Sequence, residues 1–183
     1  MMWNLPIEIE IEGQVFPIRN NCDYRVVLDT ISCLLDDSLN EQEKAQGALF
    51  IFFGDNWENI LDYEEAIKEM YRIIGYGDSS REDTEKPPIM NWEHDFQQIA
   101  PPISRTLGYD VRTTDKYTHW WTFIGAYMEI GECVFANIIS IRNKRQKGKK
   151  LEKWEQEFYC ENRKLIDLPL NLTDEEQDWL NSD

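Results

Sequence analysis

Few residues in this sequence have the type and spacing that catalysis requires. The only histidines are His94 and His119, which leaves little for general base chemistry near neutral pH. His119 lies in the segment Y-T-H-W-W, where we expect it to start a helix and hydrogen-bond a backbone group. The sequence has no nucleophile elbow, Walker loop, dinucleotide fingerprint or H-E-x-x-H motif. We therefore expect a protein that is not an enzyme and that has no catalytic residues and no cofactor.

Metal binding is the next chemistry that the residues could support. Glu8, Glu10 and Glu12 alternate along one apolar segment and could hold a divalent ion only if other oxygen ligands converged on them. A solvated strand face explains these glutamates better. The cysteines form no C-x-x-C pair and indicate neither a zinc cluster nor a disulfide scaffold, so we expect reduced thiols and no metal site. They are Cys22, Cys33, Cys133 and Cys160.

A basic run is the strongest candidate for contacts with a partner. Residues 142–153 contain seven Lys/Arg and one Glu, whereas residues 1–141 contain 25 Asp/Glu and 10 Lys/Arg. The run could bind phosphates or an acidic protein surface, or it could be a solvated loop and helix start, and its Gly148 suggests a flexible presentation. We add Met128, because its adaptable side chain suits weak contacts. The predicted partner-binding residues are Arg142, Lys144, Arg145, Lys147, Lys149, Lys150 and Met128.

The chain as a whole is acidic, with a formal net charge of −16 over 183 residues. That charge disfavours nucleic acid and anionic membranes, which are polyanions themselves. A hydrophobic content of 42%, with 13% aromatic residues, is enough for one sizeable core. The N-terminus lacks the features of a secretion signal, and no apolar stretch reaches the roughly 18 residues of a membrane helix. We expect a protein of the cell interior that binds other proteins.

The elements that must position these residues begin with a hairpin. Isoleucine and glutamate alternate from Ile7 to Ile11, residues 12–14 supply a turn, and an apolar run resumes at residues 15–18. This pattern predicts a β-hairpin whose isoleucines at positions 7, 9 and 11 face the core while the glutamates face water. Pro17 cannot donate to a ladder, which places the second strand at an edge or ends it there.

Apolar periodicity and capping residues predict helices in the rest of the chain. Pro101 and Pro102 should divide one of these segments into two short helices that meet at a bend near Ala100. Residues 75–88 are polar and rich in turn formers, and we expect a mobile loop there. The predicted helical segments are 23–35, 40–53, 62–74, 92–107, 118–130, 134–139, 151–165 and 173–180; the first begins near Asp23, and the predicted capping residues of later segments are Asn40, Asp62, Thr118 and Thr173.

The most aromatic segment should form the central helix of the domain. Its apolar residues surround much of the helix, so we expect a structural core made by Trp120, Trp121, Phe123 and Ile124. The predicted fold class is mainly α with a small N-terminal β-hairpin, a compact α+β domain of short helices. We assign residues 1–169 to this single domain and residues 170–183 to an acidic C-terminal tail with a short helix.

These elements, in this order, resemble the bacteriophage family called gene product fifteen. The similar segments are I-E-I-E-G-x-x-F-P-I, L-N-E-Q-E-K leading to F-F-G, Y-T-H-W-W-T-F, and I-I-S-I-R-N followed by a basic helix ending in L-I-D-L-P. The resemblance spans roughly Leu5 to Pro169, and its most specific part is Tyr117 to Phe123. The double proline at Pro101 and the acidic tail after Leu170 depart from the family pattern.

The resemblance implies a function in phage tail morphogenesis. Members belong to siphophages and prophages of Gram-positive bacteria and are encoded between the major tail protein and the tape-measure protein. This implies a tail assembly chaperone in the host bacterial cytoplasm that coats the tape-measure protein, recruits tail-tube subunits and could self-associate. The acidic charge also leaves open an inhibitor that mimics DNA and occupies a host nuclease or CRISPR effector. Because the acidic residues are dispersed along the chain, we favour the chaperone.

Overall fold

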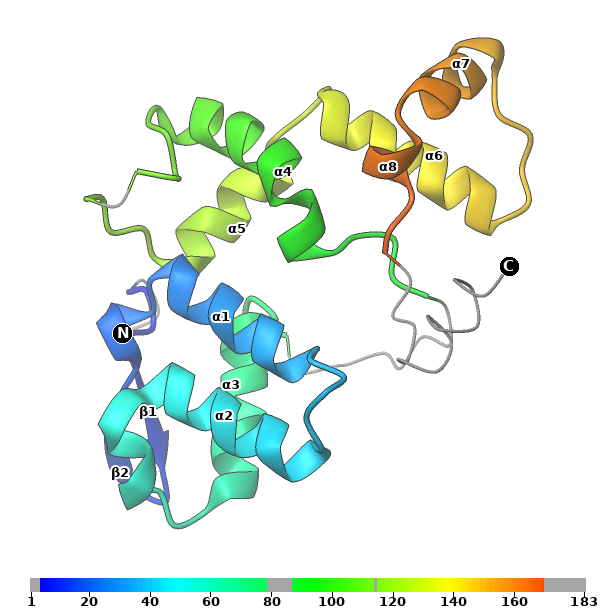
Figure 1. Ribbon diagram of the computed structural model, residues 1–183. Coiled ribbons are helices and arrows are strands. Elements are labelled where there is room, and N and C mark those ends of the chain that lie inside the picture. Colours follow the sequence, from blue (N-terminus) through cyan, green and yellow to red (C-terminus); the bar gives the residue numbers. More distant parts are fainter. Residues whose placement is uncertain (1–3, 79–86, 114, 170–183) are drawn as a thin grey trace.

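The structure is a computed structural model that describes residues 4–78, 87–113 and 115–169. Within these residues, eight α-helices follow a two-stranded antiparallel hairpin (Figure 1). This arrangement confirms the predicted fold class, mainly α with a small N-terminal β-hairpin. The predicted helix at residues 173–180 and most of the predicted loop at residues 75–88 lie outside the described residues.

The hairpin consists of β1 (Glu8–Ile11) and β2 (Gln14–Pro17), which pair antiparallel along their whole length. Ile9 and Ile11 are 3% and 2% exposed, and the glutamates of β1 point to solvent. The prediction that Ile7 also faces the core is wrong, because this side chain is 42% exposed. Ile7 lies one residue before β1, and its carbonyl oxygen still accepts a hydrogen bond of 2.8 Å from the Ile18 N–H, so backbone pairing at this position does not bury the side chain.

Three helices lie next to the hairpin in space, and each begins with a side-chain cap. At the first and third helices, an aspartate accepts a hydrogen bond from a backbone N–H two or three residues later; the second begins with a reciprocal capping box. The caps at Asn40 and Asp62 were predicted from the sequence, which for the first helix indicated only a start near Asp23. The elements of this part are the short 3₁₀ turn η1 (Arg19–Asn21), α1 (Tyr24–Leu34), α2 (Glu41–Phe53), η2 (Gly54–Asn59) and α3 (Tyr63–Ile74).

Helix α4 (Trp92–Leu107) is continuous, although Pro101 and Pro102 lie inside it. The predicted division into two short helices is therefore wrong, although α4 does bend along its length, as Figure 1 shows. Each proline removes one backbone hydrogen bond, but the neighbouring turns are held by burial of Ala100 and Ile103, both 0% exposed. Core packing thus maintains the helical backbone across the missing hydrogen bonds.

The aromatic helix α5 (Trp120–Met128) begins one residue later than predicted. Its N-cap is His119 rather than Thr118: His119 Nδ1 accepts a hydrogen bond of 3.0 Å from the Trp121 backbone N–H. His119 Nε2 lies 2.8 Å from the Pro6 carbonyl oxygen, which can only accept, so Nε2 carries the proton. The expectation that His119 starts the helix through backbone hydrogen bonds is confirmed.

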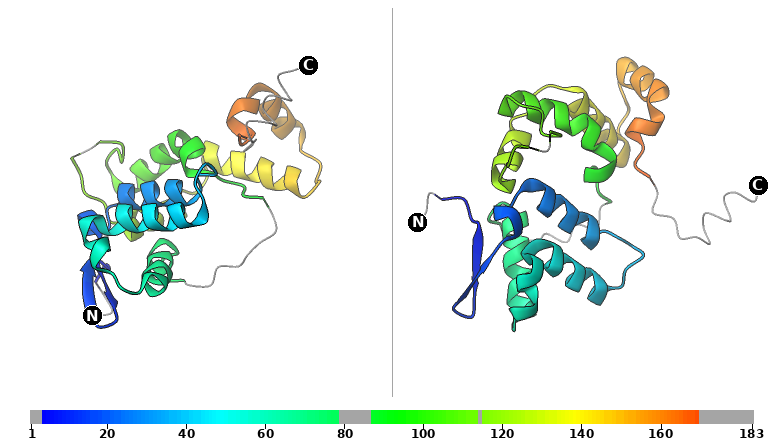
Figure 2. Two further views of the ribbon diagram at one scale, coloured as in Figure 1. Left: turned by 60° about the horizontal axis from the view of Figure 1, so that its bottom comes forward. Right: turned by 60° about the vertical axis from the view of Figure 1, so that its left-hand side comes forward.

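The C-terminal elements are α6 (Val134–Gln146), α7 (Lys153–Glu161) and α8 (Arg163–Ile166). Both views of Figure 2 place them at the end of the molecule away from the hairpin. They share a small apolar cluster, whereas the main cluster joins the hairpin to helices α1 to α5 and to Phe135 at the start of α6. No helix among the described residues is long and apolar enough to cross a membrane. The small cluster is formed by Ile138, Ile141 and Ile166, with Leu151, Phe158, Tyr159 and Leu165 packed against it.

Candidate partner-binding surface

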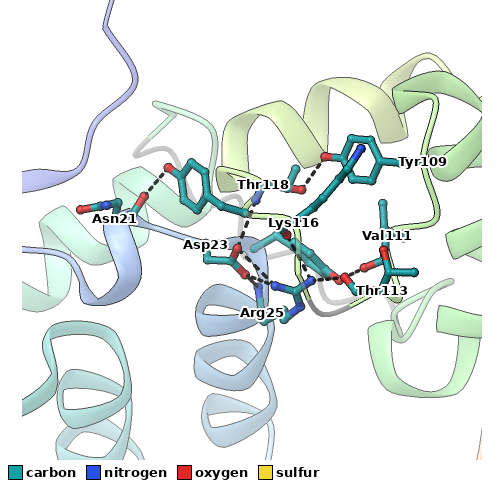
Figure 3. Close-up of polar contacts among 10 residues, drawn as sticks. Asn21, Asp23, Arg25, Tyr109, Val111, Thr113, Lys116 and Thr118 are labelled. Atoms are coloured by element: carbon teal, nitrogen blue, oxygen red, sulfur yellow. Dashed lines mark hydrogen bonds and ion pairs between the residues drawn. The ribbon is translucent and has the colours of Figure 1, made fainter.

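The Y-T-H-W-W segment is held in place by a polar network at the N-terminus of α1 (Figure 3). The Asp23 carboxylate accepts hydrogen bonds from the backbone N–H groups of Arg25, at 3.0 Å, and Thr118, at 3.1 Å. The Arg25 guanidinium donates to the carbonyl oxygens of Thr113 and Lys116, at 2.9 and 3.3 Å. One buried carboxylate and one arginine therefore fix the loop before α5 onto α1.

Tyrosine hydroxyl groups complete the same network. Tyr24 Oη donates to the Val111 carbonyl oxygen at 2.6 Å, and burial raises the Tyr24 pKa. Tyr117 Oη donates to the Asn21 carbonyl oxygen at 2.7 Å. Both hydroxyl groups bond to backbone carbonyl oxygens of the protein itself. The segment that carries the most specific part of the family resemblance therefore has a structural role here, as a clamp.

Two groups near this clamp are less able to ionise than usual because they are buried. Burial lowers the pKa of His119, so its neutral form is favoured. Burial also raises the pKa of the Cys22 thiol to about 12, and Cys22 is 0% exposed. A thiol of this kind is a poor nucleophile near neutral pH.

The residues predicted to form the structural core differ in burial. Trp120, Phe123 and Ile124 are 2%, 0% and 8% exposed. Trp121 is only partly buried, and its indole N–H donates to the Ile73 carbonyl oxygen at 2.9 Å. Trp121 therefore packs at the edge of the core with its polar atom satisfied.

The basic run does not form one continuous surface. Arg142, the first residue of the run, is 7% exposed and binds inside the protein. Its guanidinium forms a bidentate pair with the Asp95 carboxylate of α4, with N to O distances of 2.7 and 2.8 Å. It also donates to the carbonyl oxygens of Ile166, Leu165 and Ile89, at 2.5, 3.0 and 3.1 Å. All five donors are used, which removes Arg142 from the predicted contact surface.

The next two cations are bound by acidic side chains of the C-terminal elements. Lys144 Nζ lies 2.7 and 2.8 Å from the carboxylate oxygens of Glu155, which is 1% exposed. The hydrogen bond with Lys144 lowers the pKa of Glu155, and the same contact raises the pKa of Lys144. Arg145 pairs with Asp167 and lies over the Tyr159 ring, 4.1 Å from its centroid. These pairs attach α7 and α8 to α6.

The last three of the six predicted partner-binding cations differ from the others. Lys147, Lys149 and Lys150 are exposed, and among the described residues no carboxylate forms an ion pair with them. We call residues 147–150 the basic loop. It is the part of the predicted site that has charge available for a partner.

The basic loop has a defined backbone because α6 ends in a Schellman motif. The Lys149 N–H bonds to the Lys144 carbonyl oxygen at 2.8 Å, and the Gly148 N–H bonds to the Arg145 carbonyl oxygen at 3.0 Å. Gly148 has φ 63°, the left-handed conformation that this motif requires. Gly148 therefore caps α6, and the expectation that it gives the loop a flexible presentation stays a prediction. Cations in the last turn of α6 also oppose the negative end of its dipole.

Met128 is 62% exposed, but the structure does not bring it to the basic loop. It is the last residue of α5 and precedes α6, whereas the loop follows α6, and a helix of 13 residues is about 20 Å long. The sequence prediction missed Trp154, which is 47% exposed on α7 and is separated from Lys150 by three residues. It also missed Asp95, whose partner comes 47 residues later.

The fold and these surfaces define a small, acidic, mainly helical protein with a localised basic loop. The described residues contain no group of three or more His, Cys, Asp or Glu that could hold a metal ion. The profile of the family described as Bacteriophage Gp15 protein matches residues 1–168, and the chain belongs to this family. Comparisons with curated proteins and with solved structures gave no match. The family match gives no support to the alternative of a DNA-mimic inhibitor.

Proposed function

We propose that this protein is a phage tail assembly chaperone, which binds the tape-measure protein and helps to recruit the major tail protein during tail morphogenesis. Membership of the Bacteriophage Gp15 family supports a role in phage structure or assembly. On this proposal the protein acts in the host bacterial cytoplasm, by binding and not by catalysis.

The observation that carries this proposal is the exposed basic loop of a protein with net charge −16. Lys147, Lys149 and Lys150 offer three cations on an ordered backbone, a suitable contact for an acidic stretch of another chain. Trp154 and Met128 add exposed side chains that can make adaptable apolar contacts. A long chain that awaits its tail tube needs many such weak contacts to stay soluble.

Co-expression with the tape-measure protein of the same phage tests this proposal. We expect the tape-measure chain to aggregate when expressed alone and to stay soluble and co-purify when this protein is present. The combined change Lys147→Gln, Lys149→Gln and Lys150→Gln should reduce the amount that co-purifies. Lys68→Gln is the matched control, because Lys68 is an exposed lysine on α3.

Two results would contradict the proposal. One is a tape-measure chain whose solubility does not change and which does not co-purify with the wild-type protein. The other is co-purification that is reduced equally by Lys68→Gln and by the triple change, because binding would then not depend on the basic loop.

A further inference from the structure

We propose that residues 55–65, at the end of η2 and the start of α3, form a docking surface for a second copy of this chain. We call this surface the acidic patch, because exposed apolar side chains are surrounded there by acids. The part of the second copy that docks on it is the end of α6 with the basic loop and the start of α7. The inference concerns the protein alone and does not rest on the proposed function.

The centre of the acidic patch consists of apolar side chains that the fold leaves in solvent. Leu61 is 83% exposed and directly precedes Asp62, the N-cap of α3. A hydrophobic residue at this position often packs against the fourth residue of its helix, but here that residue, Ala66, is buried while Leu61 is not. Tyr63 is 46% exposed, and its ring centroid lies 6.2 Å from that of the partly buried Trp57. Apolar and aromatic side chains inside a polar rim are typical of a protein contact.

The rim of the acidic patch is negative and uncompensated. Residues 55–65 contain five acids and no Lys or Arg. Among the described residues, no cation forms an ion pair with any of the five. Asp62 and Glu65 accept hydrogen bonds from backbone N–H groups, which leave their negative charge in place. The five acids are Asp55, Glu58, Asp62, Glu64 and Glu65.

The basic loop and the start of α7 are complementary to the acidic patch. The three lysines of the loop are exposed, and no carboxylate of the described residues pairs with them. The nearby Glu152 already lies 3.8 Å from Lys144. Trp154 is 47% exposed and adds an aromatic side chain that can meet the apolar centre of the patch. Opposite charges around apolar groups favour this pairing, whereas two acidic patches repel each other.

The two surfaces lie at opposite ends of the molecule. Glu65 accepts a hydrogen bond of 3.1 Å from the Glu12 N–H, so the acidic patch adjoins the turn of the hairpin. The basic loop follows α6, in the group of helices at the end away from the hairpin (Figure 1, Figure 2). One copy therefore cannot close the contact on itself. A contact between two copies leaves one patch and one loop free, so further copies can add head to tail.

Sedimentation velocity of the purified full chain tests this self-association. At about 0.1 M salt the Debye length is about 10 Å, so the repulsion between whole acidic chains is screened while charges in contact still attract. We expect the average mass to rise with protein concentration under these conditions and to return to that of the monomer at about 1 M salt. A patch variant and a loop variant should each associate at least about tenfold more weakly. The patch variant combines Glu58→Gln, Leu61→Ser and Glu64→Gln, and the loop variant combines Lys147→Gln, Lys149→Gln and Lys150→Gln.

Mixing the two variants makes the test specific for head-to-tail contact. Each variant keeps the surface that the other has lost, so an equimolar mixture should form pairs with one copy of each and nothing larger. A matched control removes one exposed apolar side chain and two exposed acids elsewhere, and it should associate as wild type does. This control combines Met128→Ser, Glu129→Gln and Glu132→Gln. Circular dichroism measures the helical content of every variant.

Four results would overturn the proposal. The first is a wild-type protein that stays monomeric at every concentration at about 0.1 M salt. The second is association of either folded variant with wild-type strength, and the third is a mixture of the two folded variants in which no pair forms. The fourth is a matched control that weakens association as much as the patch variant does. The tape-measure protein takes part in none of these measurements, so their failure is distinct from failure of the proposed function.

Discussion

The two halves of the basic run are alike in sequence but differ in the folded protein. Arg142 is 7% exposed and uses every donor of its guanidinium on Asp95 of α4, on the Ile89 carbonyl oxygen and on the end of α8. Lys147 and Lys149 are exposed beyond the end of α6, and no described carboxylate pairs with them. The first half therefore stabilises the fold, and the second half is available to a partner.

The difference follows from geometry and burial rather than from charge. A planar guanidinium can meet a carboxylate with two parallel hydrogen bonds and still reach three carbonyl oxygens, whereas a strongly hydrated ammonium is costly to bury. Arg142 lies on the face of α6 that packs against α4, while Lys147 is the C-cap residue where the helix ends. Charged residues a few positions apart can therefore have unrelated roles.

The largest expected effect is at Arg142. Arg142→Leu would leave the Asp95 carboxylate buried without its partner, which should lower the free energy of unfolding by about 3–5 kcal/mol. Denaturant unfolding followed by circular dichroism measures this change. Lys147→Leu is the matched control and should stay within about 0.5 kcal/mol of wild type. Equal stability of the two variants would remove the distinction between the halves of the run.

A second buried polar residue, His119, sharpens the comparison because its contacts need a neutral ring. Burial lowers its folded-state pKa below the usual 6.5, so the unfolded chain takes up a proton first as the pH falls. Stability should therefore be lost as the pH falls from about 6.5 through the folded-state pKa. The measurement is the unfolding midpoint at a series of pH values. His119→Asn retains a capping oxygen without this titration, so an unchanged pH profile would contradict the assignment.

A smaller effect is expected at Gly148, which lies inside the second half of the run. Gly148→Ala places a side chain at φ 63°, and no atom lies within 4 Å of the added Cβ, so only backbone strain opposes it. We expect a loss of about 1 kcal/mol in unfolding free energy. Lys147→Ala, one residue earlier, should cost less. If Gly148→Ala were neutral, the loop would not depend on the Schellman motif.

Much of the fold could be predicted from local sequence signals. The capping pair Asn40 and Glu43, the cap at Asp62 and the alternation of the first strand each depend on residues a few positions apart, and all appear in the structure. The continuity of α4 through Pro101 could not be predicted, because burial by distant elements offsets the lost hydrogen bonds. Local rules predicted these caps and this strand, but not the path of α4 through its prolines.

The division of the basic run lay beyond sequence reasoning for the same reason. Asp95 and Arg142 are 47 residues apart, and Lys144 and Glu155 belong to different helices. Neither pair follows a helical spacing that would indicate contact. The exposed lysines were included in the predicted site, but no local sequence signal distinguished them from the buried Arg142. Only the packing of α6 against α4, α7 and α8 does so.

The measurement that tests the account most directly is the affinity for tape-measure fragments at low and high salt, for wild type and for the combined Lys147→Gln, Lys149→Gln and Lys150→Gln variant. Isothermal titration calorimetry provides the affinity, and unfolding provides the control for stability. We predict binding at least about tenfold weaker in the variant at low salt, a much smaller difference at high salt, and unfolding within about 0.5 kcal/mol of wild type. Equal affinity and equal salt dependence of the two proteins would contradict the account.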